Sequence, residues 1–311
     1  MKKALIQTLC DLMEHNDNVY LFTGDLGYGV MNPIFEQHKD RFINAGICEQ
    51  NMLSAATGMA MCGNIVFVYS IGNFPTLRCM EQIRNDAAYH NANVKIVAVG
   101  GGFAYGQLGM SHHATEDVAM LRAIPNMTVL APADSAETIE AVKLATKIDG
   151  PVYIRLGRGG ERSIDHNKLD ITRLMELNIT QNNSSPTKIA LVGSGIVMPD
   201  VENAAVSLAS EYNVSAYSLA SIKPTDIATI KKVCIENDYV FTIEEHQIIG
   251  GLGSLFAEII AENNIDVTFR RIGMQDQFTQ VVGSPAFLRR TYKIDKEGII
   301  STVKDVVKIN K

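Results

Sequence analysis

Residues 42–71, FINAGICEQNMLSAATGMAMCGNIVFVYSI, contain a short strand, a helix and a second strand in succession. FINAG is a short apolar run, the segment from Glu49 is a helix of small residues that ends at Gly63, and IVFVYS is a nearly continuous β-branched and aromatic strand. A strand that is apolar on both faces and follows a helix is typical of a parallel sheet covered on both sides. The stretch therefore predicts an α/β fold.

The same alternation continues along the chain on both sides of this stretch. VYLFT, VKIVAVGGG, MTVLAP and PVYIRLG are predicted strands, and LRCMEQIRNDAAYHN, EDVAMLRAI and SAETIEAVKLATKI are predicted helices. A polar segment at 161–187 is the predicted linker, and a second α/β pattern begins at Lys188. The sequence thus predicts two parallel-sheet, three-layer α/β domains at 1–160 and 188–311.

Composition excludes several classes of function. The 311 residues are 46% hydrophobic and 20% charged, with a net charge of −6, scattered basic residues and no Trp, so no nucleic-acid or membrane partner is expected. The N-terminus begins like a signal peptide, but Asp11 and Glu14 interrupt it, which predicts a cytoplasmic protein. The five cysteines have neither paired nor metal-binding spacing, and no metal site is predicted.

Glu49 lies in an otherwise small and apolar run, and two interpretations of it are open. In the first, Asn44 caps the helix and Glu49 stabilises it through the helix dipole by about 0.3–1 kcal/mol. In the second, a partly desolvated carboxylate at a helix N-terminus is held there to bind a hydrogen-bond donor. The segment taken alone favours the first.

Two loops carry further candidate residues. YSIGNFPTLRCMEQIRND places Phe74 in a Gly/Asn/Pro loop, where the ring either packs in the core or forms a flat wall for a bound ring. GGGFAYGQLGMSHHATED is a glycine-rich loop with the adjacent residues His112 and His113. Adjacent side chains point to opposite sides, so one histidine is expected to face a site and a two-histidine metal site is not expected.

Together these segments resemble the pyrimidine-binding and C-terminal domains of the transketolase family of thiamine diphosphate enzymes. The resemblance is carried, over nearly the whole chain, by GICEQNM, FPTLRCMEQIRND, LGMSHHATEDVAMLRAIPNMTVLAPAD, GPVYIRLGR and EEHQIIGGLGS. It implies a transketolase-like transferase that uses thiamine diphosphate and moves a two-carbon ketol unit from a ketose to an aldehyde, with small sugars as substrates.

The resemblance implies that Glu49 is both catalytic and cofactor-binding. In the family, a glutamate at this position meets N1′ of the cofactor's aminopyrimidine and stabilises the imino tautomer, which takes the proton from thiazolium C2. Phe74 is expected to stack on the same ring. Asp25 and Leu26, in TGDLG, match a loop that approaches the cofactor, and a simple turn is the alternative for them.

Three residues are implied in substrate binding. His112 matches a histidine that faces the substrate carbonyl and hydroxyls, where it is also catalytic through proton transfer or alkoxide stabilisation. His113 is expected behind His112 or at the surface. Arg158 matches an arginine that contacts a sugar phosphate, and a structural arginine at a strand end is the alternative.

The metal-binding segment of the family is missing. Thiamine diphosphate enzymes hold the diphosphate through Mg²⁺ on a Gly-Asp-Gly segment, and none occurs in this sequence. The resemblance therefore implies the C-terminal half of a split transketolase, with the Mg²⁺ ligands on a separate N-terminal, diphosphate-binding subunit. Because the family's site joins domains across a subunit interface, an α2β2 heterotetramer is expected.

The expected phosphate contacts are only partly present. Bacterial transketolases usually place a histidine near Gly100, an aspartate near Leu108 and a phosphate-binding serine where GYGVMNP stands here. A donor or acceptor other than the pentose phosphates is therefore expected, such as a modified or nucleotide-linked sugar. A normal rate with xylulose 5-phosphate and ribose 5-phosphate, with the partner supplied, would refute this.

Other functions remain open at this point. The beta subunit of a 2-oxoacid dehydrogenase decarboxylating component shares the domain order and the glutamate, 1-deoxyxylulose-5-phosphate synthase is a relative that is normally a single chain, and a non-catalytic assembly subunit could keep the fold. A dinucleotide site is disfavoured because G-x-G-x-x-G with a distal acid is absent. The glycines of IIGGLGS allow either an anion-binding turn or tight packing at a dimer interface.

Overall fold

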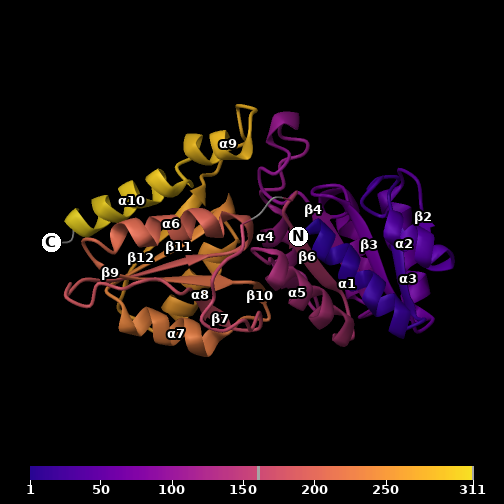
Figure 1. The fold of residues 1–311 in the computed structure, drawn as a ribbon, viewed down its shortest axis with the longest axis horizontal. Helices are drawn as coiled ribbons and strands as arrows, with labels where there is room; N and C mark the ends of the chain where they lie inside the picture. Colours follow the sequence, from indigo (N-terminus) through magenta and orange to yellow (C-terminus); the bar gives the residue numbers. More distant parts are fainter. Residues whose placement is uncertain (160–161, 310–311) are drawn as a thin grey trace.

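A seven-stranded sheet and a five-stranded sheet form the centres of two α/β domains in the computed structural model, which describes residues 1–159 and 162–309 (Figure 1). The strand orders are β10-β5-β6-β4-β3-β1-β2 and β12-β11-β8-β9-β7. The predicted fold class is confirmed, because parallel strands dominate both sheets. Each sheet also has one antiparallel edge strand, β10 or β7, which was not predicted.

The first domain follows the predicted order of elements. Its helices and strands are α1 (Lys2–His15), β1 (Val19–Thr23), α2 (Asn32–Gln37), β2 (Phe42–Asn44), α3 (Glu49–Met61), β3 (Ile65–Ile71), β4 (Val94–Val99), α4 (Asp117–Arg122), β5 (Thr128–Leu130), α5 (Ser135–Lys147) and β6 (Val152–Leu156). The predicted helix at 77–91 differs: it begins with the 3-10 turn Leu77–Cys79 and continues as the π-helix Gln82–Ala88. Helix α2 was not predicted.

Alternation along β3 shows how both faces of the first sheet are buried. Val66 and Val68 belong to the core cluster that contains α3, whereas Phe67 and Tyr69 belong to the cluster that contains α1 and α5. Helices therefore cover both faces, which explains why the strands are apolar throughout.

The second domain has the same layered plan. Its elements are β7 (Leu174–Glu176), β8 (Lys188–Gly193), α6 (Met198–Leu208), β9 (Asn213–Leu219), α7 (Ile227–Glu236), β11 (Tyr239–Gln247), α8 (Leu252–Glu262), β12 (Thr268–Met274), α9 (Pro285–Thr291) and α10 (Lys296–Ile309). Helices α6 and α10 lie on one face of the sheet, and α7 and α8 lie on the other (Figure 1). Helices α9 and α10 were not predicted.

Two short strands tie the halves of the chain together. The segment predicted as a linker, 161–187, contributes β7, in which Leu174 and Met175 are buried rather than solvated. Strand β10 (Ser221–Lys223) lies beyond this segment in sequence, yet it pairs antiparallel with β5 of the first sheet. The predicted boundary at residues 160 and 161 lies outside the described residues, so that division stays a prediction.

Within the described residues, no helix has both the length and the apolar character needed to cross a bilayer.

Candidate functional site

Glu49 is the first residue of α3, and only 2% of its side chain is exposed. Its Oε2 accepts a 2.7 Å hydrogen bond from Nη1 of Arg78. Cys48 is the N-cap residue, and no side chain caps the helix. Asn44 instead accepts hydrogen bonds from the backbone N–H groups of Asp25 (3.1 Å) and Gly46 (3.0 Å). The interpretation in which Asn44 caps this helix is therefore wrong.

The turn that holds Asp25 and Leu26 lies beside Glu49. A Cβ added at Gly24 would be 3.7 Å from Cγ of Glu49, so this turn passes close to the glutamate. Hydrogen bonds from the hydroxyl group of Tyr28 and from Nδ2 of Asn44 hold the pKa of Asp25 below its ordinary value. The structure thus places the turn at the candidate site, and contact of Asp25 and Leu26 with a cofactor stays a prediction.

Arg78 is a residue of the candidate site that the sequence did not single out. Its guanidinium carbon lies 4.6 Å from the ring centroid of Phe74 while the same group donates to Glu49. Stacking of this kind is a cation–π contact. The sequence held no clear signal for this contact, because Phe74 lies in the loop before the predicted helix and Arg78 lies inside that helix.

Glu49 and Phe74 fit the aminopyrimidine ring of thiamine diphosphate. One planar, hydrogen-bonding cation, the guanidinium of Arg78, already satisfies the buried carboxylate of Glu49 and covers the ring of Phe74. A planar aminopyrimidine would use this same pair of contacts. The two surfaces therefore lie close enough together to be covered by one flat group.

His112 completes the group. Its ring lies edge-on to Phe74, with the ring centroids 5.2 Å apart and an interplanar angle of 69°. Its Nδ1 is 3.0 Å from the hydroxyl oxygen of Ser111, and the side chain is half-buried. Glu49, Phe74 and His112, which are far apart in sequence, are thus linked: Arg78 contacts Glu49 and Phe74, and Phe74 contacts His112.

His113 is buried, with only 3% of it exposed. Its Nε2 lies 3.0 Å from the carbonyl oxygen of Gly106 and must donate, because a carbonyl only accepts. Its Nδ1 lies 2.6 Å from the hydroxyl oxygen of Thr279, in the second domain. Both ring nitrogens are therefore used to hold the loop, and substrate contact by His113 stays a prediction.

Arg158 is exposed, and its guanidinium carbon lies 5.0 Å from the ring centroid of Tyr105. The ring of Tyr105 packs directly on Gly100, whose φ is +94°. A Cβ added at Gly100 would lie 2.2 Å from Cε2 of Tyr105. Tyr105, which was not predicted as a site residue, thus fills the space that a side chain at position 100 would need.

A cavity of about 850 Å³ adjoins the group at the junction of the domains. Phe74, Arg78 and His113 line it from the first domain, and Ile249 and Phe278 line it from the second. The candidate site therefore borders the second domain.

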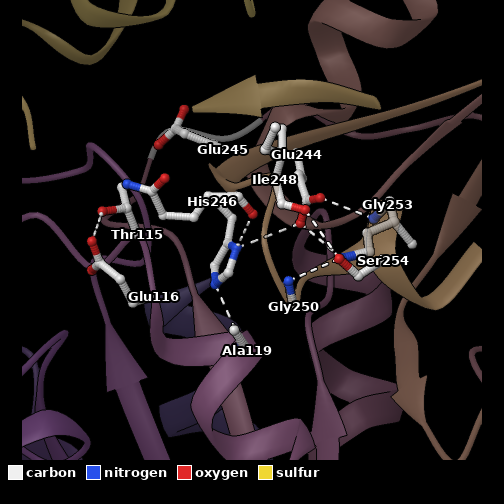
Figure 2. A network of polar contacts seen from close by, with 12 residues as sticks. Thr115, Glu116, Ala119, Glu244, Glu245, His246, Ile248, Gly250, Gly253 and Ser254 are labelled. Atoms are coloured by element: carbon white, nitrogen blue, oxygen red, sulfur yellow. Dashed lines mark hydrogen bonds and ion pairs between the residues drawn. The ribbon is translucent and has the colours of Figure 1, made fainter. Parts of the chain in front are cut away.

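A buried ionic network crosses the same junction. Oδ2 of Asp117 accepts hydrogen bonds from Nε of Arg155 (2.8 Å) and from the hydroxyl group of Tyr153 (2.5 Å). Nη2 of Arg155 donates to the carbonyl oxygen of Glu245 at 3.0 Å, which ties β6 to β11. Nε2 of His246 accepts from the backbone N–H of Ala119 at 3.3 Å (Figure 2). The second domain thus contacts the first through polar groups that are almost completely buried.

The glycine-rich turn before α8 already holds an anionic group of this chain. The two carboxylate oxygens of Glu244 accept from the backbone N–H groups of Leu252 (2.8 Å) and Gly253 (2.9 Å), at the N-terminus of α8 (Figure 2). A Cβ at Gly251 would lie 2.0 Å from the carboxylate of Glu244. The glycines therefore serve close packing within the second domain, and a bound anion there is not needed.

Comparisons with known proteins agree with this geometry. Residues 1–162 match the transketolase pyrimidine binding domain, and residues 180–299 match the transketolase C-terminal domain. A subunit of apulose-4-phosphate transketolase from Phocaeicola vulgatus is 32% identical over 309 residues, which are 99% of this chain and 97% of that protein. Transketolase from Homo sapiens is 30% identical over 315 residues, which are 98% of this chain and 49% of the human protein. A solved structure described as a split gene transketolase, inactive beta4 tetramer, has a TM-score of 0.85 and 31% identity, and covers 99% of this chain and 98% of its own. The chain belongs to the transketolase family.

Proposed function

We propose that this chain is the pyrimidine-binding subunit of a split, thiamine diphosphate-dependent transketolase. It transfers a two-carbon ketol unit from a ketose to an aldehyde acceptor, together with a separate diphosphate-binding subunit. The grouping of Glu49, Phe74 and His112 carries the proposal, because it unites a buried carboxylate, an aromatic wall and a proton-transfer group. Relatives of nearly equal length that are described as a transketolase subunit and as a split gene transketolase support the two-chain form.

The residues have separate roles in this reaction. Thiamine diphosphate, when bound, supplies a thiazolium carbon that accepts the two-carbon unit. Glu49 binds N1′ of the aminopyrimidine and holds a proton there, and Phe74 orients the ring. His112 exchanges a proton with the substrate's oxygen or stabilises negative charge on it. Arg158 offers a guanidinium to an anionic group of the sugar.

The partner supplies what this sequence lacks. Gly-Asp-Gly does not occur here, so the Mg²⁺ ligands and the diphosphate site are placed on the partner. The proposed assembly is an α2β2 heterotetramer, since the family's site joins domains of two subunits. A cytoplasmic location is proposed, because all five cysteines are free thiols, as is usual in a reducing compartment. The 2-oxoacid dehydrogenase and assembly-subunit alternatives are not favoured, since the relatives are described as transketolases.

Titration of thiamine diphosphate and Mg²⁺ tests the shared site. We expect no measurable binding to this chain alone and saturable binding to an equimolar mixture with the diphosphate-binding subunit. Isothermal titration calorimetry measures both. Tight binding by the isolated chain would contradict the split site. An absence of binding in the mixture would instead favour a non-catalytic subunit.

Arg78→Met is expected to tighten cofactor binding in that mixture. The guanidinium of Arg78 contacts both Glu49 and Phe74, so it must leave before an aminopyrimidine can use them. Removing this competitor raises the fraction of sites that can bind the cofactor. If Arg78 covers Glu49 and Phe74 in about 90% of the molecules, its removal lowers the apparent Kd about tenfold. Arg84→Met, at an exposed arginine in the adjacent π-helix, is the control and should leave Kd unchanged. Weaker binding by Arg78→Met would show that Arg78 is itself a cofactor ligand.

A further inference from the structure

The loop from Gly102 to Ala114 carries Tyr105 and His112, and the second domain holds it in place. We propose that Glu245 of the second domain is a positioning residue, which fixes this loop and thereby the place of His112 in the site. The catalytic consequence rests on the proposed function. The contact by which Glu245 holds the loop, called the clamp below, is a property of this chain and can be measured without the partner.

The two ends of the loop are joined at its base. The backbone N–H of Gly102 donates to the carbonyl oxygen of Ala114 at 2.8 Å, and the N–H of Ala114 donates back to Gly102 at 3.0 Å. Nη2 of Arg155 also donates to the Ala114 carbonyl oxygen, at 2.8 Å. The base of the loop is therefore fixed to β6 of the first sheet.

Glu245 holds the other side of this base from the second domain. Its Oε1 accepts a 2.6 Å hydrogen bond from the backbone N–H of Phe103, and its Oε2 accepts from Nη1 of Arg289 at 3.0 Å. Gly102 has a φ of +61°, and a Cβ there would lie 2.3 Å from Oε1 of Glu245. The carboxylate thus reaches the backbone only because position 102 has no side chain.

The body of the loop also rests on the second domain. The side chain of Phe103 is fully buried in the core cluster of that domain, and its ring stacks on Tyr292 with centroids 5.7 Å apart. The backbone N–H of Gly283 donates to Gly106 at 3.2 Å. With the contact of His113 to Thr279, this loop has anchors on both sides of Tyr105. Contacts with the second domain therefore fix the conformation of a loop that belongs to the first domain.

The neighbouring residue provides a matched control. Glu244 and Glu245 are consecutive in β11, both are almost completely buried, and burial raises the pKa of both carboxyl groups. Glu244 accepts from the N-terminus of α8, whereas Glu245 accepts from the loop. Figure 2 shows the carboxyl group of Glu244 directed toward Gly253 and that of Glu245 directed away from it. The same substitution therefore removes either a contact inside the second domain or the clamp on the loop.

Hydrogen exchange on the isolated chain tests the clamp directly. Glu245→Ala is expected to speed amide exchange in residues 103–113 by about tenfold, the effect of losing one charge-assisted hydrogen bond. Glu244→Ala is expected to speed exchange at the start of α8 and to leave 103–113 as in the wild type. Glu245→Gln keeps an oxygen that can accept from Phe103, so it should restore slow exchange in the loop although it weakens the pairing with Arg289.

Kinetics with the partner test the consequence. Glu245→Ala is expected to raise KM for the sugars and to lower kcat/KM by up to about 100-fold, as misplacing a catalytic group does, while the Kd for thiamine diphosphate stays unchanged. Glu244→Ala should keep the wild-type KM, and Glu245→Gln should recover most of the lost kcat/KM. Two results would overturn the clamp. One is an equal amide exchange rate of residues 103–113 in Glu244→Ala and Glu245→Ala. The other is an exchange rate of this loop in Glu245→Gln that is as fast as in Glu245→Ala. Failure of cofactor binding in the mixture, with the loop exchange as expected, would count against the proposed function and leave the clamp standing.

Discussion

Glu49→Gln lowers kcat for ketol transfer by about 10²–10⁴-fold, the range for loss of a positioned proton-transfer group. An amide can still hydrogen-bond, but it cannot hold and return a proton at the pyrimidine nitrogen. The buried position of Glu49 leaves no room for bulk water to take over this role. The measurement is the steady-state rate in the mixture with the diphosphate-binding subunit, at saturating cofactor.

Two controls separate chemistry from folding in this experiment. Glu81→Gln makes the same change at an exposed glutamate nearby and should keep the wild-type kcat. Thermal unfolding of Glu49→Gln should show a folded chain, because glutamine can still accept from Arg78 at this site. A folded Glu49→Gln variant with a kcat close to that of the wild type would contradict the role of Glu49.

Asp117→Asn lowers the free energy of unfolding by about 3–5 kcal/mol, because it leaves Arg155 as a buried charge without its partner. Both side chains are almost completely excluded from water, at 0% and 5% exposure, so solvent cannot replace the carboxylate. Urea denaturation measures the loss. Glu258→Gln, which breaks the partly exposed pair with Arg122 across the same domain junction, should cost less than about 1 kcal/mol. Equal losses in the two variants would show that burial does not decide the strength of these pairs.

The pH dependence of stability has a definite sign at Asp117. Burial alone would raise the pKa of this carboxyl group, but the charge of Arg155 and the hydrogen bonds from Arg155 and Tyr153 hold it below its ordinary value. In acid, the unfolded chain therefore binds more protons at this carboxyl group than the folded chain does. The stabilisation is fully present above the ordinary carboxyl pKa of about 3.9 and is lost as the pH falls through the lowered value. Asp117→Asn should remove this part of the acid dependence of urea unfolding.

Apolar runs made most of the strands predictable from the sequence, whereas the strands β7 and β10 and the helices α2, α9 and α10 were missed. Strand β4 is buried at every position and has an unmistakable pattern, even though it includes Lys95, whose ammonium donates to the carbonyl oxygens of Ile148 and Gly150 at 2.7 Å. Strands β7 and β10 have three residues each, too few to show a period, and they depend on neighbours supplied by the fold. The π-helix after Phe74 was missed because its residues are ordinary helix formers.

Candidate site residues came from the sequence where they matched motifs of the family. Residue type alone left Glu49 and Phe74 open between a structural and a site role, and the resemblance to transketolases singled them out together with His112. Arg78 and Tyr105 were not singled out, since their roles depend on which side chains they meet after folding. An alternation of hydrophobic residues reports burial, but it contains no information about such pairings.

Strand β10 has a consequence for how this gene can be divided. The region 1–162, which matches the pyrimidine binding domain, lacks the strand that closes its own sheet beside β5. A fragment cut at that point presents the backbone N–H and C=O groups of β5 at an open edge, which is a template for aggregation between copies. A split of the gene or an exchange of domains at this junction would therefore have to keep residues 221–223 with the first domain. The two domains are for this reason best transferred together.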